Sequence, residues 1–220
     1  MSLSPLAALL SRKRLLVFDF DGTIVDSSPL HARAFSEAFA PDGIEVDYST
    51  IAGMTTAAAV DKLAAGAGLM LAPEKREALI LDKRERALRL VESELKPIDG
   101  AVEFVRAARA RWPLALCTSG SRRTIDVALD RVGLTGAFDP LITAESVTHS
   151  KPHPEGFLKA AAAHGVAPGD ALVFEDAETG LAAARAAGID VIHVIPALER
   201  AGAGQADWTA LNAALLELGL

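Results

Sequence analysis

A short apolar run that ends in two closely spaced carboxylates constrains this chain most. Leu15–Phe18 predicts a strand buried on both faces, because none of its four residues can face water favourably. Asp19–Thr23 (Asp-Phe-Asp-Gly-Thr) follows at once, so the first carboxylate lies where the strand leaves the core. In open α/β sheets, ligands bind beyond the carboxyl ends of the strands. A simple acidic turn would account for Asp21-Gly22 but not for the whole pattern.

Length, charge and cysteine content exclude several classes of protein. The chain has 220 residues, half of them apolar, which suffices for one large domain and a small one. Its net charge is −7 and it has no basic stripe, so nucleic acid is not an expected partner. The single cysteine, Cys117, lies in an apolar run and is expected to be buried. A single cysteine cannot form an internal disulfide and suits a reducing cytoplasm, which is the expected location. No apolar stretch reaches about 18 residues and no signal-peptide pattern is present, so a membrane is not an expected partner. The chain is expected to be a monomer.

Between the first strand and the next, the sequence is helical throughout. Ser28-Pro29 predicts a helix with serine as N-cap and proline at its first position. Thr55 or Thr56 can cap a second helix, and Pro73 can open a third. No strand signal interrupts residues 49–94. The sequence therefore predicts a helical cap domain over 29–96, inserted into a core domain formed by residues 1–28 and 97–220.

After residue 97, strands alternate with helices. The expected strands cover 114–117, 141–143, 171–174 and 189–195, and a final amphipathic helix covers 208–218. Alternation of this kind predicts parallel strands joined by right-handed crossovers. The fold class is therefore α/β, with a Rossmann-like parallel sheet and an inserted helical domain. The one linker-like segment is the alanine- and glycine-rich stretch 201–204.

Three further strand ends or loops carry polar residues. Thr118-Ser119-Gly120 follows the second strand, where a hydroxyl and successive N–H groups suit an anion, although Ser121 can simply cap the next helix. Lys151 lies in a loop stiffened by two prolines, where a fixed ammonium can neutralise a phosphoryl group. Glu175-Asp176 ends another apolar strand and suits Mg²⁺, the alternative being an N-cap for a helix near Glu178.

Two histidines lie beside this lysine. His149 and His153 have the spacing that suits zinc on a helix, but Pro152 and Pro154 argue against a helix there. The sequence therefore favours surface or loop roles for both histidines over metal binding.

These four stretches resemble, in order, the motifs of the haloacid dehalogenase superfamily. The resemblance covers essentially the whole chain, and the insertion looks like the family's helical C1 cap. Lys151-Pro152-x-Pro154 and the run Phe174–Ala177 (Phe-Glu-Asp-Ala) are similar to the branch of β-phosphoglucomutase and sugar-phosphate phosphatases. Membership implies a core strand order of 5-4-1-2-3 with Asp19 on the central strand.

The resemblance also implies a mechanism. Mg²⁺ would be held by Asp19, the backbone carbonyl of Asp21, and Asp176, with Glu175 as a further or water-mediated partner. Asp19 would attack phosphorus and form an aspartyl phosphate, while Asp21 acts as general acid and then base. Thr118, Lys151 and backbone N–H groups near Phe20 would bind the phosphoryl oxygens. The expected substrate-binding positions are Phe20, Gly22, His31, Gly53, Thr55, Ser119, Gly120 and Arg122. Of these, His31 and the loop of Gly53 and Thr55 match positions in relatives, whereas Arg122 follows the second motif and could meet the distal part of a substrate.

Some of these positions have ordinary structural alternatives. His31 matches a histidine of the mutase-like branch but can equally be a surface helix residue, and Arg122 can be a solvated helix charge. In the mutase branch an arginine occupies the cap-loop position of Thr55, which cannot form a bidentate pair with phosphate. Another basic residue, such as Lys62 or Arg84, could take the place of that arginine, so mutase chemistry stays an alternative. The sequence favours hydrolysis of a small sugar or polyol phosphate over it.

Two non-enzyme hypotheses and one other enzyme class are alternatives to a phosphatase. A catalytically silent binding module would be expected to have lost a carboxylate, yet Asp19 and Asp21 are both present. A response-regulator receiver would be about half as long and would lack the insertion. A dehalogenase would be expected to lack Asp21.

Overall fold

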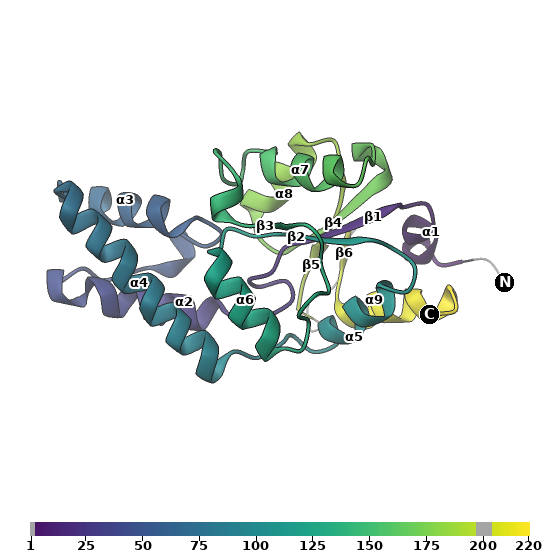
Figure 1. Cartoon of the computed structure of the whole chain (residues 1–220), viewed down its shortest axis with the longest axis horizontal. Coiled ribbons are helices and arrows are strands. Elements are labelled where there is room, and N and C mark those ends of the chain that lie inside the picture. The colour runs from purple at the N-terminus through teal and green to yellow at the C-terminus, as the bar shows by residue number, and fades with distance from the viewer. Residues whose placement is uncertain (1–2, 197–203) are drawn as a thin grey trace.

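The computed structural model describes residues 3–196 and 204–220, so most of the stretch 201–204 lies outside the described residues. The helices of the predicted insertion form one end of the molecule, and a sheet covered by helices forms the rest (Figure 1). The described residues begin and end at the side of the sheet-containing part that is far from these helices (Figure 1).

The sheet contains six parallel strands in the described residues, in the order β3-β2-β1-β4-β5-β6. This confirms the α/β class and the predicted order of the first five strands. The sixth strand was not predicted, because two residues carry no periodic signal. The strands are β1 (Leu15–Phe18), β2 (Leu114–Cys117), β3 (Leu141–Ile142), β4 (Ala171–Glu175), β5 (Asp190–Val194) and β6 (Gln205–Ala206).

Helices cover both faces of the sheet. Leu16 and Phe18 of β1 pack toward one face, and Leu15 and Val17 pack toward the other, as the alternation of a strand requires. On the first face lie α1 (Pro5–Ser11), α5 (Ala101–Ala108), α6 (Arg122–Arg131) and α9 (Trp208–Glu217). On the second lie α7 (Glu155–Ala163) and α8 (Glu178–Ala186) (Figure 1). Two 3₁₀ turns, Ala144–Ser146 and Pro168–Asp170, complete this part.

The inserted helices have an apolar cluster of their own. They are α2 (Ser28–Phe39), α3 (Thr56–Gly66) and α4 (Pro73–Glu94), with 3₁₀ turns at Ala40–Asp42 and Tyr48–Thr50. Phe35, Phe39 and Val60 are buried in this cluster, which is separate from the two clusters on the sheet. A separate core is what a cap domain over 29–96 needs in order to fold as a unit.

Three predicted helix starts need comment. Ser28 is the first residue of α2, so the predicted Ser28 N-cap is wrong and Ser27 holds that position. The Ser27 hydroxyl caps no N–H and instead donates to Asp21 Oδ1 at 2.6 Å. Thr55 caps α3 as expected, since its Oγ1 accepts the Ala58 N–H. The alternative that Glu175 or Asp176 caps α8 is also wrong, because Ala177 is the N-cap.

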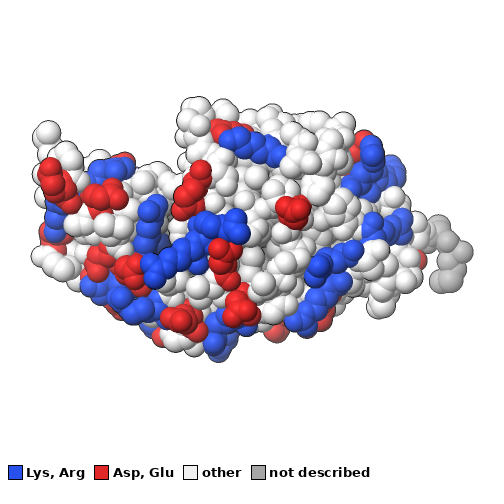
Figure 2. Space-filling model, in the orientation of Figure 1, with Lys and Arg blue, Asp and Glu red and all other residues white. Residues whose placement is uncertain are grey.

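The cap contacts the core along α4 and α6 and through one loop. Arg123 of α6 lies 2.9 Å from Glu85 of α4, and Ser119 Oγ donates to the Gly53 carbonyl at 2.9 Å. Figure 2 shows charges of both signs interspersed over the cap and the cap–core boundary, and an outline that dips between the two parts. No helix in the described part of the chain is long and apolar enough to span a membrane.

Candidate active site

The candidate site is a cleft between the cap and the carboxyl ends of β1, β2 and β4. The strand order reverses around β1. The chain therefore leaves the ends of β2 and β4 toward opposite faces of the sheet, which opens a crevice between them. Residues from both parts line it. The polar ones are Asp19, Asp21, Ser28, Ser119, Ser121, Thr124, Lys151, Glu175 and Asp176 from the core, and His31, Tyr48, Thr56, Lys83 and Arg84 from the cap.

Three carboxylates and one ammonium form the floor of this cleft. Asp19 and Glu175 are buried, Asp176 is half-buried, and one carboxylate oxygen of each lies within 4.8 Å of the others. Lys151 Nζ lies 2.5 Å from Asp19 Oδ1 and 3.2 Å from Glu175 Oε1. The side chain of Lys151 is only 7% exposed, so these contacts are shielded from solvent. The structure thus brings together four residues that the sequence places up to 157 positions apart (176 against 19).

The three carboxylates of this cluster outnumber its single ammonium, so negative charge is in excess. Burial and the neighbouring charge of Glu175 raise the pKa of Asp19, and burial and Asp176 raise that of Glu175, although Lys151 opposes both shifts. Burial disfavours the Lys151 ammonium, but Asp19 and Glu175 outweigh it and hold the pKa of Lys151 above its usual range. Grouped hard oxygens with an excess of negative charge suit a divalent cation such as Mg²⁺. The residues present therefore fit the metal that the family implies.

Two glycines make room for these carboxylates. A Cβ at Gly22, where φ is +85°, would lie 2.1 Å from Asp176 Oδ2, and a Cβ at Gly180 would lie 1.4 Å from Glu175 Oε1. Either contact would displace the carboxylate. Thr23 Oγ1 also donates to Asp176 Oδ1 at 2.8 Å and fixes its orientation. Gly180 was not predicted, although a glycine in the first turn of the helix after an acidic pair was a readable signal.

Asp21 lies in a different environment from Asp19. Its carboxylate accepts hydrogen bonds from Ser27 Oγ at 2.6 Å and Thr118 Oγ1 at 3.3 Å, and it contacts His31 Nε2 at 3.2 Å. Burial alone would raise the pKa of Asp21, but His31, the Ser27 hydrogen bond and the charge of Lys83 outweigh it and lower that pKa to about 2. Asp21 is therefore ionised in the absence of a ligand, whereas burial favours the protonated form of Asp19.

The cap reaches Asp21 through two side chains. Lys83 Nζ lies 3.1 Å from His31 Nδ1 and 4.4 Å from the centroid of the Phe35 ring. Because a lysine ammonium can only donate, His31 Nδ1 accepts and Nε2 carries the hydrogen that faces Asp21. Lys83 is 5% exposed, and burial lowers its pKa to about 8. The sequence analysis missed Lys83, although its position three after Ile80 and four before Ala87 places it on the buried face of α4.

The remaining predicted positions divide into two groups. Ser119, Gly120, Gly53 and His31 line the cleft, and Thr118 lies behind Asp21, with its Oγ1 also accepting the Gly120 N–H at 3.0 Å.

The others lie elsewhere or offer only backbone. Thr55 lies outside the lining, which includes its neighbour Thr56. Arg122 pairs with Asp126 on its own helix and does not line the cleft, whereas Arg84 does. The Phe20 side chain is buried in the sheet core, so its backbone is the part that can meet a ligand. Cys117 is buried as predicted, and burial raises the pKa of its thiol to about 12.

Comparison with known proteins agrees with this geometry. A family model of haloacid dehalogenase-like hydrolases matches residues 13–188. The fructose-1-phosphate phosphatase YqaB of Escherichia coli (strain K12) is 33% identical over 179 residues, which cover 81% of this chain and 95% of that protein. The validoxylamine A 7'-phosphate phosphatase of Streptomyces hygroscopicus subsp. limoneus is 31% identical over 195 residues, which cover 88% of this chain and 91% of that protein.

Solved structures show the same architecture. The crystal structure of β-phosphoglucomutase from Clostridium difficile superposes with a TM-score of 0.79 over 94% of this chain and 98% of its own, at 20% identity, which is a likeness of fold. The chain therefore belongs to the haloacid dehalogenase-like hydrolases and is a phosphoric monoester hydrolase.

Proposed function

We propose that this enzyme hydrolyses the phosphate monoester of a small sugar or polyol, with Mg²⁺ as cofactor and an aspartyl phosphate on Asp19 as intermediate. The observation that carries the proposal is the buried cluster of Asp19, Lys151, Glu175 and Asp176, with Asp21 beside it in the same cleft. The similarity to phosphatases of phosphorylated sugars supports the substrate class.

The chemical difficulty is that an anionic nucleophile must approach an anionic phosphate. Two like charges about 4 Å apart repel by roughly 4 kcal/mol at an effective dielectric of 20. Mg²⁺, held by Asp19, Asp176, the Asp21 carbonyl and, directly or through water, Glu175, would supply the positive charge that offsets this repulsion. Lys151 adds a fixed ammonium at Asp19. The Thr118 hydroxyl and the N–H groups from Phe20 onward would bind the phosphoryl oxygens.

Asp21 would serve both half-reactions. In the first, it must carry a proton to the leaving oxygen, and the negative charge of a bound phosphate raises its pKa from the low ligand-free value. In the second, it must take a proton from the attacking water, which its ionised form suits. His31, in contact with the same carboxylate, orients it for both steps.

The cap side of the cleft suits a hydroxyl-rich substrate. Lys83, Arg84, Tyr48 and Thr56 line it, and each can donate a hydrogen bond to an oxygen of the group that carries the phosphate. Lys83 and Arg84 also support the second candidate, a β-phosphoglucomutase-type transfer, because two cations on the cap side could hold a second phosphate. We place hydrolysis first, because Thr55, where the mutase branch has its arginine, lies outside the lining.

A panel of phosphorylated metabolites with Mg²⁺ tests the proposal. We expect free phosphate from fructose 1-phosphate and hexitol phosphates, faster than from phosphoglycolate or nucleotides, and no activity in excess chelator until Mg²⁺ is restored. Full activity in chelator would contradict the metal assignment. β-Glucose 1-phosphate with a trace of its 1,6-bisphosphate separates the candidates: glucose 6-phosphate appearing faster than free phosphate would establish the mutase reaction instead. If the folded protein turns over none of these substrates, the catalytically silent binding module would be favoured instead.

A further inference from the structure

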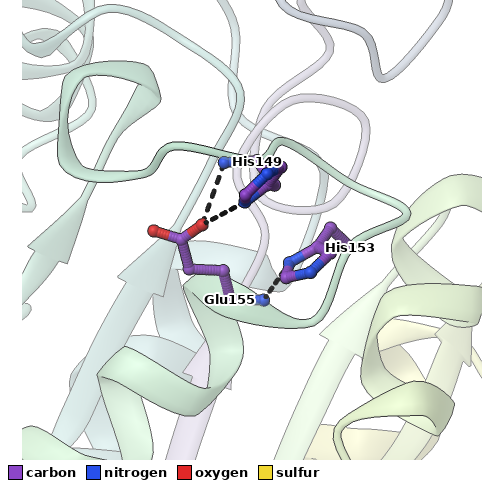
Figure 3. Close-up of side chains that lie close together, drawn as sticks. All are labelled: His149, His153 and Glu155. Atoms are coloured by element: carbon purple, nitrogen blue, oxygen red, sulfur yellow. Dashed lines mark hydrogen bonds and ion pairs between the residues drawn. The ribbon is translucent and has the colours of Figure 1, made fainter.

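A second cluster of metal-ligand side chains lies on the loop that carries Lys151. His149 and His153 flank this lysine, and Glu155 is the first residue of α7. Figure 3 shows the two imidazole rings close together on the loop, with the glutamate side chain reaching the His149 ring. One ligand atom from each of the three residues lies within 4.8 Å of the others. The prolines exclude a helix, as the sequence predicted, yet the bend of the loop brings both rings together without one.

The geometry of the cluster is close to that of a zinc site. Glu155 Oε2 lies 3.2 Å from His149 Nδ1, and donors around a tetrahedral zinc with bonds of about 2.0–2.1 Å are about 3.3 Å apart. The ring centroids of His149 and His153 are 4.6 Å apart. His153 Nδ1 accepts the Glu155 N–H, so its Nε2 is the nitrogen left for a ligand. Both rings are exposed, so rotation of each side chain can bring its free nitrogen to within bonding distance of a shared metal ion.

The carboxylate of this cluster is already held in place. Glu155 accepts the backbone N–H groups of Thr148 and His149, both at 2.9 Å (Figure 3 shows the second). A ligand that is fixed before binding loses little conformational freedom when the metal arrives. One contact opposes a cation: Lys159 Nζ lies 2.7 Å from Glu155 Oε1. The Lys159 side chain is 46% exposed, so it can turn into solvent.

We infer that His149, His153 and Glu155 form a binding site for an imidazole-preferring divalent cation such as Zn²⁺, separate from the acidic cluster in the cleft. Two ring nitrogens and one carboxylate oxygen are ligands that Zn²⁺ accepts, with water filling the remaining position. Mg²⁺ prefers oxygen ligands and would occupy the acidic cluster instead. The two histidines lie on either side of Lys151, so a bound metal would tie together both ends of the segment that presents this lysine.

Calorimetric titration with Zn²⁺ in excess Mg²⁺, which occupies the acidic cluster, tests the site. We expect one zinc per chain at micromolar concentration, and at least about a tenfold loss of affinity in His149→Gln and in His153→Gln. His164→Gln, which removes an imidazole at the other end of α7, is the matched control and should bind zinc as the wild type does. Circular dichroism of each variant checks that the fold is kept. Absence of zinc binding by the wild type, or equal losses in His149→Gln and His164→Gln, would overturn the inference.

Lys159→Gln gives a test in the opposite direction. Removing the ammonium beside Glu155 should strengthen zinc binding about fivefold, because a like charge no longer opposes the metal. A purely structural role for the glutamate would not produce this gain. Unchanged or weaker binding in Lys159→Gln would show that the Glu155 carboxylate is not a ligand.

Discussion

Two lysines are buried at the cleft, one from each part of the molecule, and their surroundings differ. Lys151 of the core contacts two carboxylates, Asp19 and Glu175. Lys83 of the cap contacts the neutral His31 ring and lies over the Phe35 ring. The pKa of Lys151 is accordingly held above its ordinary value, whereas burial lowers that of Lys83 to about 8, with the charge of Asp21 only partly offsetting it.

The difference teaches that burial and pairing act in opposite directions on a lysine. Burial alone disfavours the ammonium, and only carboxylates in direct contact reverse that effect. Lys151 is therefore a fixed positive charge that suits phosphoryl oxygens. Lys83 is better described as a positioned donor, suited to the uncharged part of a substrate and to holding His31. Three substitutions test this contrast, and a fourth tests how the two parts of the molecule that carry these lysines are held together.

The largest effect is expected from Asp19→Asn, which removes the carboxylate that pairs with the Lys151 ammonium. Phosphate release should fall by roughly 10³-fold or more, because an amide cannot attack phosphorus and is a poorer metal ligand. Asp26→Asn makes the same chemical change at an exposed position seven residues away and should leave turnover unchanged. If Asp19→Asn keeps even a tenth of wild-type phosphate release, measured at saturating Mg²⁺, Asp19 is not the nucleophile.

Lys151→Met should lower both activity and stability. It leaves Asp19 and Glu175 buried without their cation, a change that typically lowers the free energy of unfolding by about 3–5 kcal/mol. Urea denaturation in the presence of chelator measures it, and added Mg²⁺ should recover part of the loss because it replaces the missing charge. A loss below about 1 kcal/mol without metal would mean that the pairing contributes little.

Lys83→Met should separate function from stability. The new side chain fills similar space beside Phe35, so the free energy of unfolding should change by less than about 1 kcal/mol. The value of kcat/KM should fall about tenfold, which corresponds to losing one charge-assisted hydrogen bond. Lys62→Met, at an exposed cap position, is the control and should alter neither quantity. A destabilisation as large as that of Lys151→Met would show that Lys83, like Lys151, stabilises the fold through its charge.

The smallest effect concerns how the cap is held over the core. Gly53 has φ +76°, and a Cβ there would lie 2.6 Å from Thr179 Oγ1 of the core. Gly53→Ala should therefore weaken substrate binding by about 1 kcal/mol, seen as a severalfold rise in KM. Gly66→Ala, at the end of α3 with open space around it, should leave KM unchanged. Equal KM values for the two variants would show that this loop does not set cap closure.

The core side of the site could be predicted in advance. Asp19, Thr118 and Glu175-Asp176 all follow or end apolar runs, and parallel strands place their carboxyl ends at one edge of a sheet. That local signal predicted these positions, and two prolines indicated the loop that carries Lys151. The order of the strands came only from the resemblance to the haloacid dehalogenase superfamily. Gly180 and Thr23 escaped notice as site residues because their part is to make room for, or orient, a carboxylate that arrives from another strand.

On the cap side, the sequence determined little beyond the helices themselves. It indicated where α3 and α4 begin, from Thr55 and Pro73, and it named His31, Lys62 and Arg84 only as open alternatives. Only the tertiary structure decided that Lys83 and Arg84 line the cleft while Thr55 and Arg122 do not. The physical reason is that a helix presents side chains all around its axis, and its rotation is fixed by packing against distant segments. A strand end in a parallel sheet has no such freedom, so its position could be read from the chain alone.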